Sequence, residues 1–181
     1  MLQPEIIETN RLILRGFSEK DITYIFDNFT KTEIKKTLGH SSDEEYEKEL
    51  YKHKNGYASY NRSFMLFLLV DKNTQKTIGR CGIHNWNKDH QRAEIGYNMT
   101  DENFKNQGFM TEALAPIIAY GFQKLNLNRL EAIVNIDNMA SLKLIHKNNF
   151  VKEAQMKKYF KISDAFEDAY FFALLKDEYK G

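Results

Sequence analysis

The sequence predicts a single mixed α/β domain, residues 1–181, in which a block of three strands separates two helical regions. A length of 181 residues is typical of one domain. Hydrophobic residues make up 42% and charged residues 28%, as in soluble globular proteins. Strand-like and helix-like stretches follow one another in the order β-α-α-β-β-β-α-β-α-β-β, which is typical of a mixed α/β fold.

The first third of the chain predicts one strand followed by helices. Residues 11–17, RLILRGF, alternate between apolar and polar side chains as a strand does. Ser18 stands three residues before Asp21, which is a capping-box signal for a helix. The basic stretch 31–36 predicts only a solvated face. The polar segment 41–61 carries a thin apolar stripe and predicts an exposed helix or helix pair that acts as a lid.

The middle of the chain predicts an antiparallel meander. Residues 63–71 form a nearly continuous apolar run, as a central strand does. Short turns connect this run to strands at 76–86 and 92–100. The remaining elements are expected as a helix at 108–125, a strand at 128–135, a helix at 138–148, and strands at 149–160 and 165–175.

Composition excludes several classes of function. A net charge of +1 gives no electrostatic reason to expect a nucleic-acid partner or a membrane surface. The longest apolar run, 64–70, is too short to span a bilayer, and the N-terminal residues lack the apolar core of a signal peptide. Cys81 is the only cysteine, so a reducing, cytoplasmic compartment is expected and Cys81 is interpreted as a buried thiol. The five histidines show no helical pairing, so no metal site is expected.

Gly108 joins a polar stretch directly to an apolar helix. The first four N–H groups of a helix lack partners, and the helix dipole adds positive charge there. Glycine allows a ligand to approach that backbone, while Lys105 adds a cation and Thr111 a hydroxyl. The join therefore predicts a site for a phosphate or pyrophosphate. A capped helix behind a loop glycine explains the same residues without a ligand, and neither a P-loop nor a dinucleotide fingerprint is present.

Residues 105–114, KNQGFMTEAL, resemble the acyl-CoA loop of the GNAT N-acetyltransferase superfamily, whose pattern is Q/R-x-x-G-x-G/A. Lys105 stands in the Gln/Arg place, Gly108 matches the first glycine, and Met110 occupies the Gly/Ala place. Stretches at 8–21, 92–99, 135–150 and 166–179 resemble further blocks of the subgroup of ribosomal-protein N-terminal acetyltransferases, in the same order. The resemblance implies a central, mostly antiparallel sheet of about seven strands that splays between the fourth and the fifth.

The resemblance also implies an acetyl-CoA site. In this interpretation the backbone of the residues from Asn98 to Thr100 pairs with the pantetheine arm, and an N–H near Met99 stabilises the tetrahedral intermediate. The residues that it assigns to acetyl-CoA are Asn98, Met99, Thr100, Lys105, Asn106, Gln107, Gly108, Phe109, Met110, Thr111, Asn138 and Ser141. Acetyl-CoA is then a cosubstrate, and no metal takes part.

Two catalytic residues follow from the same resemblance. Glu94 is the candidate base or amine-binding group, acting directly or through water; the alternative is a surface glutamate paired with Arg92 or Lys88. Ser141 is the candidate donor to the leaving thiolate, because many relatives carry a tyrosine for this step and Ile145 occupies its place here. The alternative for Ser141 is a helix residue bonding back to the carbonyl of residue 137.

Three residues depart from the pattern of the family. Met110 is larger than the usual glycine or alanine and narrows access to the pyrophosphate. Asn149 replaces a glycine, and asparagine tolerates the left-handed turn expected there. Pro116 lies inside the expected helix and predicts a kink.

The acceptor is left open by the sequence. One hypothesis is the N-terminal α-amine of a protein, such as a ribosomal protein. The second is a small amine, such as a polyamine, an amino sugar or an amino acid. A third, outside the enzymes, is a module that binds acyl-CoA without turnover. Acceptor choice is expected to lie in residues 31–62 and the last hairpin, and a homodimer is compatible with the resemblance.

Overall fold

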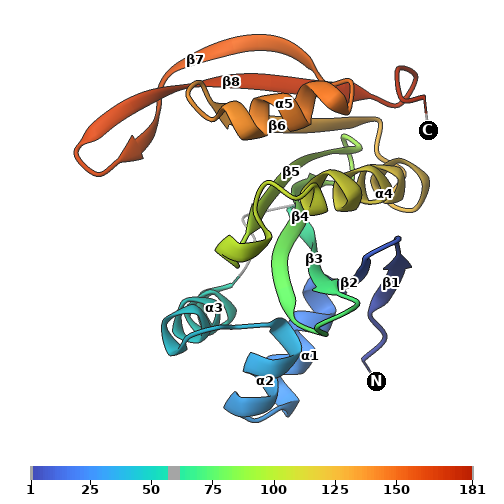
Figure 1. Ribbon diagram of the computed structural model, residues 1–181, viewed down its shortest axis with the longest axis vertical. Coiled ribbons are helices and arrows are strands. Elements are labelled where there is room, and N and C mark those ends of the chain that lie inside the picture. The colour runs from blue at the N-terminus through green and yellow to red at the C-terminus, as the bar shows by residue number, and fades with distance from the viewer. Residues whose placement is uncertain (1, 57–61, 181) are drawn as a thin grey trace.

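A single open sheet forms the centre of the computed structural model, which describes residues 2–56 and 62–180 (Figure 1). Its strand order is β1-β2-β3-β4-β5-β6-β8-β7 within those residues. The strands are β1 (Glu5–Glu8), β2 (Leu12–Ser18), β3 (Ser63–Asp71), β4 (Thr77–Asn87), β5 (Arg92–Met99), β6 (Arg129–Asn135), β7 (Val151–Ile162) and β8 (Ala165–Leu175). The helices are α1 (Glu19–Asn28), α2 (Lys31–Leu38), α3 (Asp43–Asn55), the short 3₁₀ helix η1 (Glu102–Phe104), α4 (Phe109–Gln123) and α5 (Met139–Lys147).

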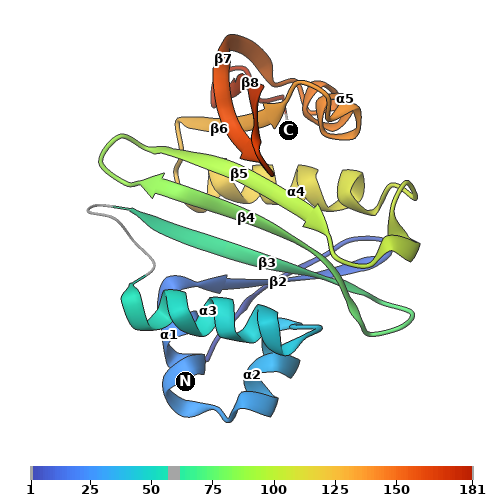
Figure 2. The same ribbon diagram turned by 90° about the vertical axis from the view of Figure 1, so that its left-hand side faces the viewer.

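Helices cover both faces of this sheet. In β3, Phe67 and Leu69 belong to the core under α4 and α5, whereas Leu68 and Val70 pack on the opposite side with α1 and α2. Successive side chains of a strand point to opposite faces, so the unbroken apolar run of β3 serves both layers. Figure 2 shows α4 behind β4 and β5, with α1–α3 gathered at the other end of the sheet.

The helical region after β2 is more regular than the sequence suggests. The expected capping box at the start of α1 is present, with Ser18 accepting from the Asp21 N–H. Residues 31–36 were expected as a solvated face, but they belong to α2, whose Ile34 and Leu38 are buried. A second capping box, between Thr30 and Glu33, starts this helix and is the signal that identifies it.

Helix α3 has no buried residue, in agreement with the expected exposed helix. Residues 57–61 of the expected lid lie outside the described residues. One further strand, β1, lies beside β2 and brings the described sheet to eight strands, against about seven expected. Its four residues are too few to show a period, and their pairing with β2 defines the strand.

Strands β5 and β6 separate, as the resemblance implies. They are parallel neighbours, and their recorded pairing covers only three residue pairs, from Arg92 with Arg129 to Glu94 with Glu131. Beyond this point β5 continues along β4 to Met99, whereas β6 continues along β8 to Asn135. The opening between the two strands is called the wedge below.

Two backbone expectations concern the helices near the wedge. Asn149 has a φ of 62°, so it adopts the left-handed conformation expected in place of glycine. Helix α4 is continuous through Pro116, and the predicted kink stays a prediction. None of the helices in the described ranges is long and apolar enough to cross a membrane.

Candidate functional site

Gly108 is the N-cap of α4 and has a φ of 79°, a left-handed conformation that favours glycine. No side chain caps this helix, so its first N–H groups are open to a ligand. A Cβ at Gly108 would meet only Arg11 Nη2, at 3.7 Å, so the space above the glycine is open. The local geometry is therefore that of an anion cradle.

A cavity of about 390 Å³ lies against this helix start and is called the donor cavity here. Its lining includes ten of the twelve residues expected to bind acetyl-CoA: Asn98, Met99, Lys105, Asn106, Gly108, Phe109, Met110, Thr111, Asn138 and Ser141. Thr100 and Gln107 are not part of it. The Thr100 N–H donates to the Ile78 carbonyl of β4 at 3.0 Å, and the Gln107 side chain donates to the Asn103 carbonyl.

The direction of the Thr100 N–H also determines where the preceding amide points. Successive residues of an antiparallel strand direct their N–H groups alternately toward and away from a given neighbour. Since Thr100 donates to β4, the N–H of Met99 points away from β4 and into the wedge. The expected backbone donor near Met99 is therefore free of the sheet on the side where a ligand would lie.

The corner between β1 and β2 braces the start of α4, a feature that sequence reasoning missed. Thr9 Oγ1 and the Arg11 N–H each donate to Glu112 Oε1 at 2.6 Å, and Arg11 Nε donates to Oε2 at 2.7 Å. Arg11 Nη1 also donates to the Gln107 carbonyl at 3.1 Å, and its guanidinium lies 3.9 Å from the centre of the Phe109 ring. About a hundred residues separate the partners, so no local pattern reveals this contact.

Glu94 is held by residues other than those weighed from the sequence. Its Oε2 accepts from Asn85 Nδ2 at 3.1 Å, and its Oε1 lies 3.8 Å from His84 Nε2. Arg92 instead pairs with Glu131, and Lys88 lies over the Trp86 ring. The Glu94 side chain is 20% exposed and lines a cavity of about 270 Å³ in the wedge, called the wedge cavity.

The donor cavity and the wedge cavity share three lining residues, Tyr97, Asn138 and Ser141. Asn138 caps α5 by accepting from the Ser141 N–H at 3.1 Å. The Tyr97 hydroxyl is buried with no regular hydrogen bond among the described residues. Burial raises the pKa of Tyr97 to about 12, and the nearby Ser141 hydroxyl offsets part of the rise. Ser141 thus lies where the two cavities meet, with Glu94 in the wedge cavity and Gly108 in the donor cavity.

Tyr97 is the third residue at this junction, and the sequence suggests for it either a wall of the substrate channel or, by default, core packing. Ile145, in the place of the tyrosine of many relatives, is fully buried in the core. Cys81 is fully buried as expected, and burial raises the pKa of its thiol. Tyr97 lies two residues beyond Ile95 on the strand that carries Glu94, and its side chain packs against the core.

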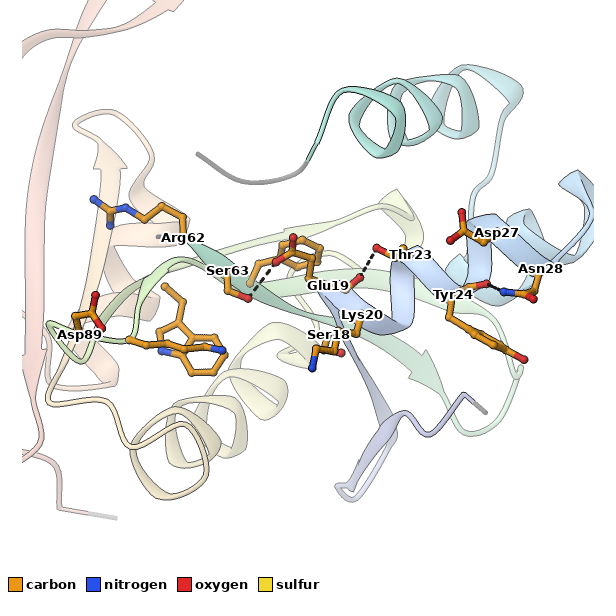
Figure 3. A pocket seen from close by; sticks show the side chains of 13 residues that line it. Ser18, Glu19, Lys20, Thr23, Tyr24, Asp27, Asn28, Arg62, Ser63 and Asp89 are labelled. Atoms are coloured by element: carbon orange, nitrogen blue, oxygen red, sulfur yellow. Dashed lines mark hydrogen bonds between the residues drawn. The ribbon is translucent and has the colours of Figure 1, made fainter. Parts of the chain in front are cut away.

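A further cleft, of about 890 Å³, lies away from this junction. It follows the start of α1, where Figure 3 shows Glu19, Thr23 and Tyr24, and its lining includes Trp86 and Lys88. Ser63 donates to Glu19 across it at 3.3 Å. None of the residues that the resemblance assigns to acetyl-CoA or to catalysis lines this cleft.

Comparisons with known proteins agree with the geometry. Residues 11–151 match the model of the acetyltransferase (GNAT) domain. The chain is 33% identical over 179 residues to the N-acetyltransferase p20 of Bacillus licheniformis, covering 98% of this chain and 99% of that protein. It is 29% identical over 125 residues to the ribosomal-protein-serine acetyltransferase of Escherichia coli, covering 69% of this chain and 65% of that protein.

Among solved structures, the spermidine/spermine N-acetyltransferase SpeG of Vibrio cholerae is similar with a TM-score of 0.67 at 22% identity, over 93% of this chain and 94% of that chain. That likeness concerns the fold. GNAT acetyltransferases use acetyl-CoA. From the family match, the full-length relative and the shared architecture, the protein belongs to the GNAT acetyltransferase family and is an acyltransferase.

Proposed function

We propose that the protein transfers the acetyl group of acetyl-CoA directly to a primary amine in a ternary complex, and that the amine is the N-terminal α-amine of a protein. The observation that supports this most is the junction at Tyr97 and Ser141, where the donor cavity meets the wedge cavity that holds Glu94. A donor and an acceptor that enter from the two cavities meet there.

The donor cavity suits acetyl-CoA. The open N–H groups at the start of α4 face the pyrophosphate, and Gly108 lets it approach the backbone. Lys105 lines the same cavity, and its ammonium pairs with Glu102 Oε1 at 2.5 Å. The free N–H of Met99 lies beside the pantetheine arm and the thioester. Asn138 and Ser141 close the cavity from α5.

The reaction needs a neutral amine. An α-amine has a reference pKa near 8, so a fraction is neutral at pH 7 and a weak base is sufficient. Glu94 accepts the proton, directly or through water, as the nitrogen attacks the thioester carbon. The Met99 N–H stabilises the oxyanion of the tetrahedral intermediate. Collapse of the intermediate breaks the C–S bond, and the thiolate receives a hydrogen bond from the hydroxyl of Ser141.

The choice of a protein α-amine is supported by the sequence-level relative named a ribosomal-protein-serine acetyltransferase. The alternative, a small amine such as a polyamine, is supported by the fold of SpeG, which is named a spermidine/spermine N-acetyltransferase. A sensor that binds acyl-CoA without turnover is the third candidate.

The first test is calorimetric titration of the protein with acetyl-CoA, beside a Gly108→Trp variant. Micromolar binding that the variant loses is the expected result, since the indole would fill the space above the N-cap. If the unmodified protein does not bind acetyl-CoA, the assignment of the donor cavity is wrong.

A Glu94→Gln variant then separates an enzyme from a sensor. Turnover is expected to fall roughly 100-fold or more, which is the usual contribution of a positioned general base. Binding of acetyl-CoA is expected to stay unchanged, because Glu94 does not line the donor cavity. Unchanged turnover of a tested acceptor would contradict the role of Glu94 as the base.

A further inference from the structure

A third cavity, of about 350 Å³, lies between the helices α1–α3 and the strands β3 and β4, and is called the distal cavity. His84 and Asn85 form one end of its wall, and the same two residues hold Glu94. His40, which follows α2, and Arg80 of β4 also line it. The distal cavity therefore begins beside the candidate base and follows β4 to Arg80, whose partner on β5, Asn98, lines the donor cavity.

A strip without side chains connects Glu94 with the distal cavity. Gly82 of β4 is paired with Gly96 of β5, between the pair of His84 with Glu94 and the pair of Arg80 with Asn98. Gly82 lines the distal cavity, and Gly96 lines the wedge cavity. A Cβ at Gly96 would come within 2.8 Å of His84 Nε2, so the glycine leaves room for that ring against the strand.

Buried polar atoms without partners lie at the far end of this strip. His40 is only 8% exposed, and neither of its ring nitrogens has a hydrogen-bond partner among the described residues. The Nε of Arg80 is likewise buried and unpartnered. Buried polar groups are almost always hydrogen-bonded, so each of these atoms calls for a partner.

The Arg80 guanidinium is fixed in place by other contacts. Its Nη2 donates to the carbonyls of Leu38 and Gly39 at the end of α2, at 3.3 and 3.4 Å. Glu45 lies 3.7 Å from the same nitrogen. The buried Nε–H has no partner among the described residues. Burial, followed by the charge of Arg80, lowers the pKa of His40. A neutral imidazole supplies one more N–H donor.

The carboxylates around the distal cavity are already engaged. Glu49 accepts from Lys52 at 2.7 Å, and Glu45 accepts from the Ser41 N–H at 2.7 Å besides its contact with Arg80. Glu49, the carboxylate within the described lining, is thus already paired with a lysine. Two of the unpartnered atoms, Arg80 Nε and one ring nitrogen of a neutral His40, are N–H donors, which bind oxygen, and the other ring nitrogen of His40 is an acceptor.

We propose that the distal cavity binds the far part of the acceptor, and that His40 and Arg80 donate hydrogen bonds there to a carboxylate or amide-carbonyl oxygen. Arg80 and His84 are four residues apart on β4, so the oxygen and the reacting amine are separated by a span of roughly 13 Å or less. A short extended peptide, which carries a carbonyl oxygen at such a distance from its α-amine, fits this description. This inference rests on the proposed function, because it names the acceptor class of the same site.

Four acceptors that share the α-amine of alanine test this inference. They differ only at the distal end: alanyl-γ-aminobutyrate carries a carboxylate, its primary amide a carbonyl, alanine butylamide a methyl group, and alanine aminobutylamide an ammonium. Their turnover is measured with acetyl-CoA, and their binding is measured by calorimetry on protein saturated with CoA. The binding arm ranks the compounds even if turnover is slow.

The two compounds with a distal oxygen are expected to bind roughly 10- to 100-fold more tightly than the methyl compound, as for hydrogen bonds to a charged donor. Arg80→Met and His40→Phe are expected to remove this preference and leave binding of the methyl compound and of acetyl-CoA unchanged. Arg15→Met serves as a control, because Arg15 lines none of the cavities described.

Three results would overturn the inference: equal binding of all four compounds, tightest binding of the ammonium compound, or an unchanged preference in Arg80→Met. If either Arg80→Met or His40→Phe melts at a lower temperature and no longer binds acetyl-CoA, that variant is misfolded and is left out. The preference among the four compounds is then measured in the other variant. Failure of the unmodified protein to bind acetyl-CoA would contradict the proposed function itself and is seen before any acceptor is added.

Discussion

At the scale of single residues, Gly108 combines a backbone requirement with an open space. A side chain at a left-handed φ costs about 1–2 kcal/mol. Gly56 also has a positive φ, 86°, and no described atom lies near its missing Cβ, but its ψ of 138° lies outside the left-handed α region of Gly108. We expect Gly56→Ala to lower the free energy of unfolding at least as much as Gly108→Ala does, measured by urea titration.

Only Gly108→Ala is expected to weaken acetyl-CoA binding, by roughly 10-fold, since its methyl group enters the space assigned to the pyrophosphate. Equal affinities for the two variants would mean that the ligand does not approach the backbone at Gly108.

Tyr97 and Ser141 present two hydroxyls at the junction of the cavities. Because burial raises the pKa of Tyr97 to about 12, its phenol stays protonated over the working range of pH and can donate. We expect Tyr97→Phe and Ser141→Ala each to lower kcat, roughly 10-fold or more, with the KM for acetyl-CoA nearly unchanged. An unchanged kcat in Tyr97→Phe, measured by thiol release, would assign this side chain to packing.

At the scale of elements, the brace between the β1–β2 corner and α4 is the contact that orients the CoA loop. Burial alone would raise the pKa of Glu112, but hydrogen bonds from Thr9 and Arg11 outweigh it and keep the pKa below its usual value. Arg11→Ala leaves the carboxylate in the first turn of α4 with fewer partners, close to the place of the ligand phosphates. We expect affinity for acetyl-CoA to fall more than affinity for acetyl-pantetheine, which has no phosphate.

Replacing Glu112 by Gln in the Arg11→Ala background is expected to restore part of the affinity for acetyl-CoA, since it removes the uncompensated negative charge. If calorimetry shows that Arg11→Ala loses the same affinity for acetyl-CoA as for acetyl-pantetheine, the contact between Arg11 and Glu112 has only a general structural role.

The same carboxylate makes stability depend on pH. A carboxyl group whose pKa is lowered by folding stabilises the folded state above its unfolded pKa, near 4.5, and this contribution is lost as the pH falls through the folded pKa. The free energy of unfolding is therefore expected to fall less between pH 7 and pH 4 in Glu112→Gln than in the unmodified protein. Urea titrations of both proteins at the two pH values measure the difference. An equal change in the free energy of unfolding in both proteins would contradict the pairing of Glu112 with Thr9 and Arg11.

The elements also show which features of the fold and of the candidate site the sequence predicts. Glycine before an apolar helix and a strand-like stretch at 92–99 are local patterns, so the uncapped start of α4 at Gly108 and the place of Glu94 on a strand were predictable. The capping box of α2, between Thr30 and Glu33, is also a local pattern, but the basic residues in 31–36 led to the expectation of a solvated face. The contacts of Glu112 with Thr9 and Arg11 depend on how distant elements pack, and the burial of His40 within a polar segment depends on the helices above it. Neither leaves a periodic signal.

At the scale of the whole molecule, binding to the folded state alone raises stability. Acetyl-CoA at 100 times its Kd is expected to add about 2.7 kcal/mol. For a chain of this size each kcal/mol raises Tm by roughly 2–4 °C. A thermal scan with and without the ligand measures this shift, and Gly108→Trp is the control in which no shift is expected.

The wedge divides the sheet into two sets of strands, β1–β5 and β6–β8, joined through only three residue pairs of a parallel ladder. A central strand normally protects its amides on both sides. The parallel pairing of Glu94 with Glu131 places the Ile95 N–H on the Glu131 carbonyl, but beyond Ile95 the amides of β5 that face away from β4 have no paired strand beside them in the described structure. The Tyr97 N–H shares the direction inferred for the Met99 N–H, so this part of the sheet is expected to exchange its amide hydrogens as an edge strand does. If the pantetheine arm of acetyl-CoA occupies the wedge, these amides are expected to become protected from exchange. The arm would then act as an added strand of the sheet, and its thioester would react at the same place.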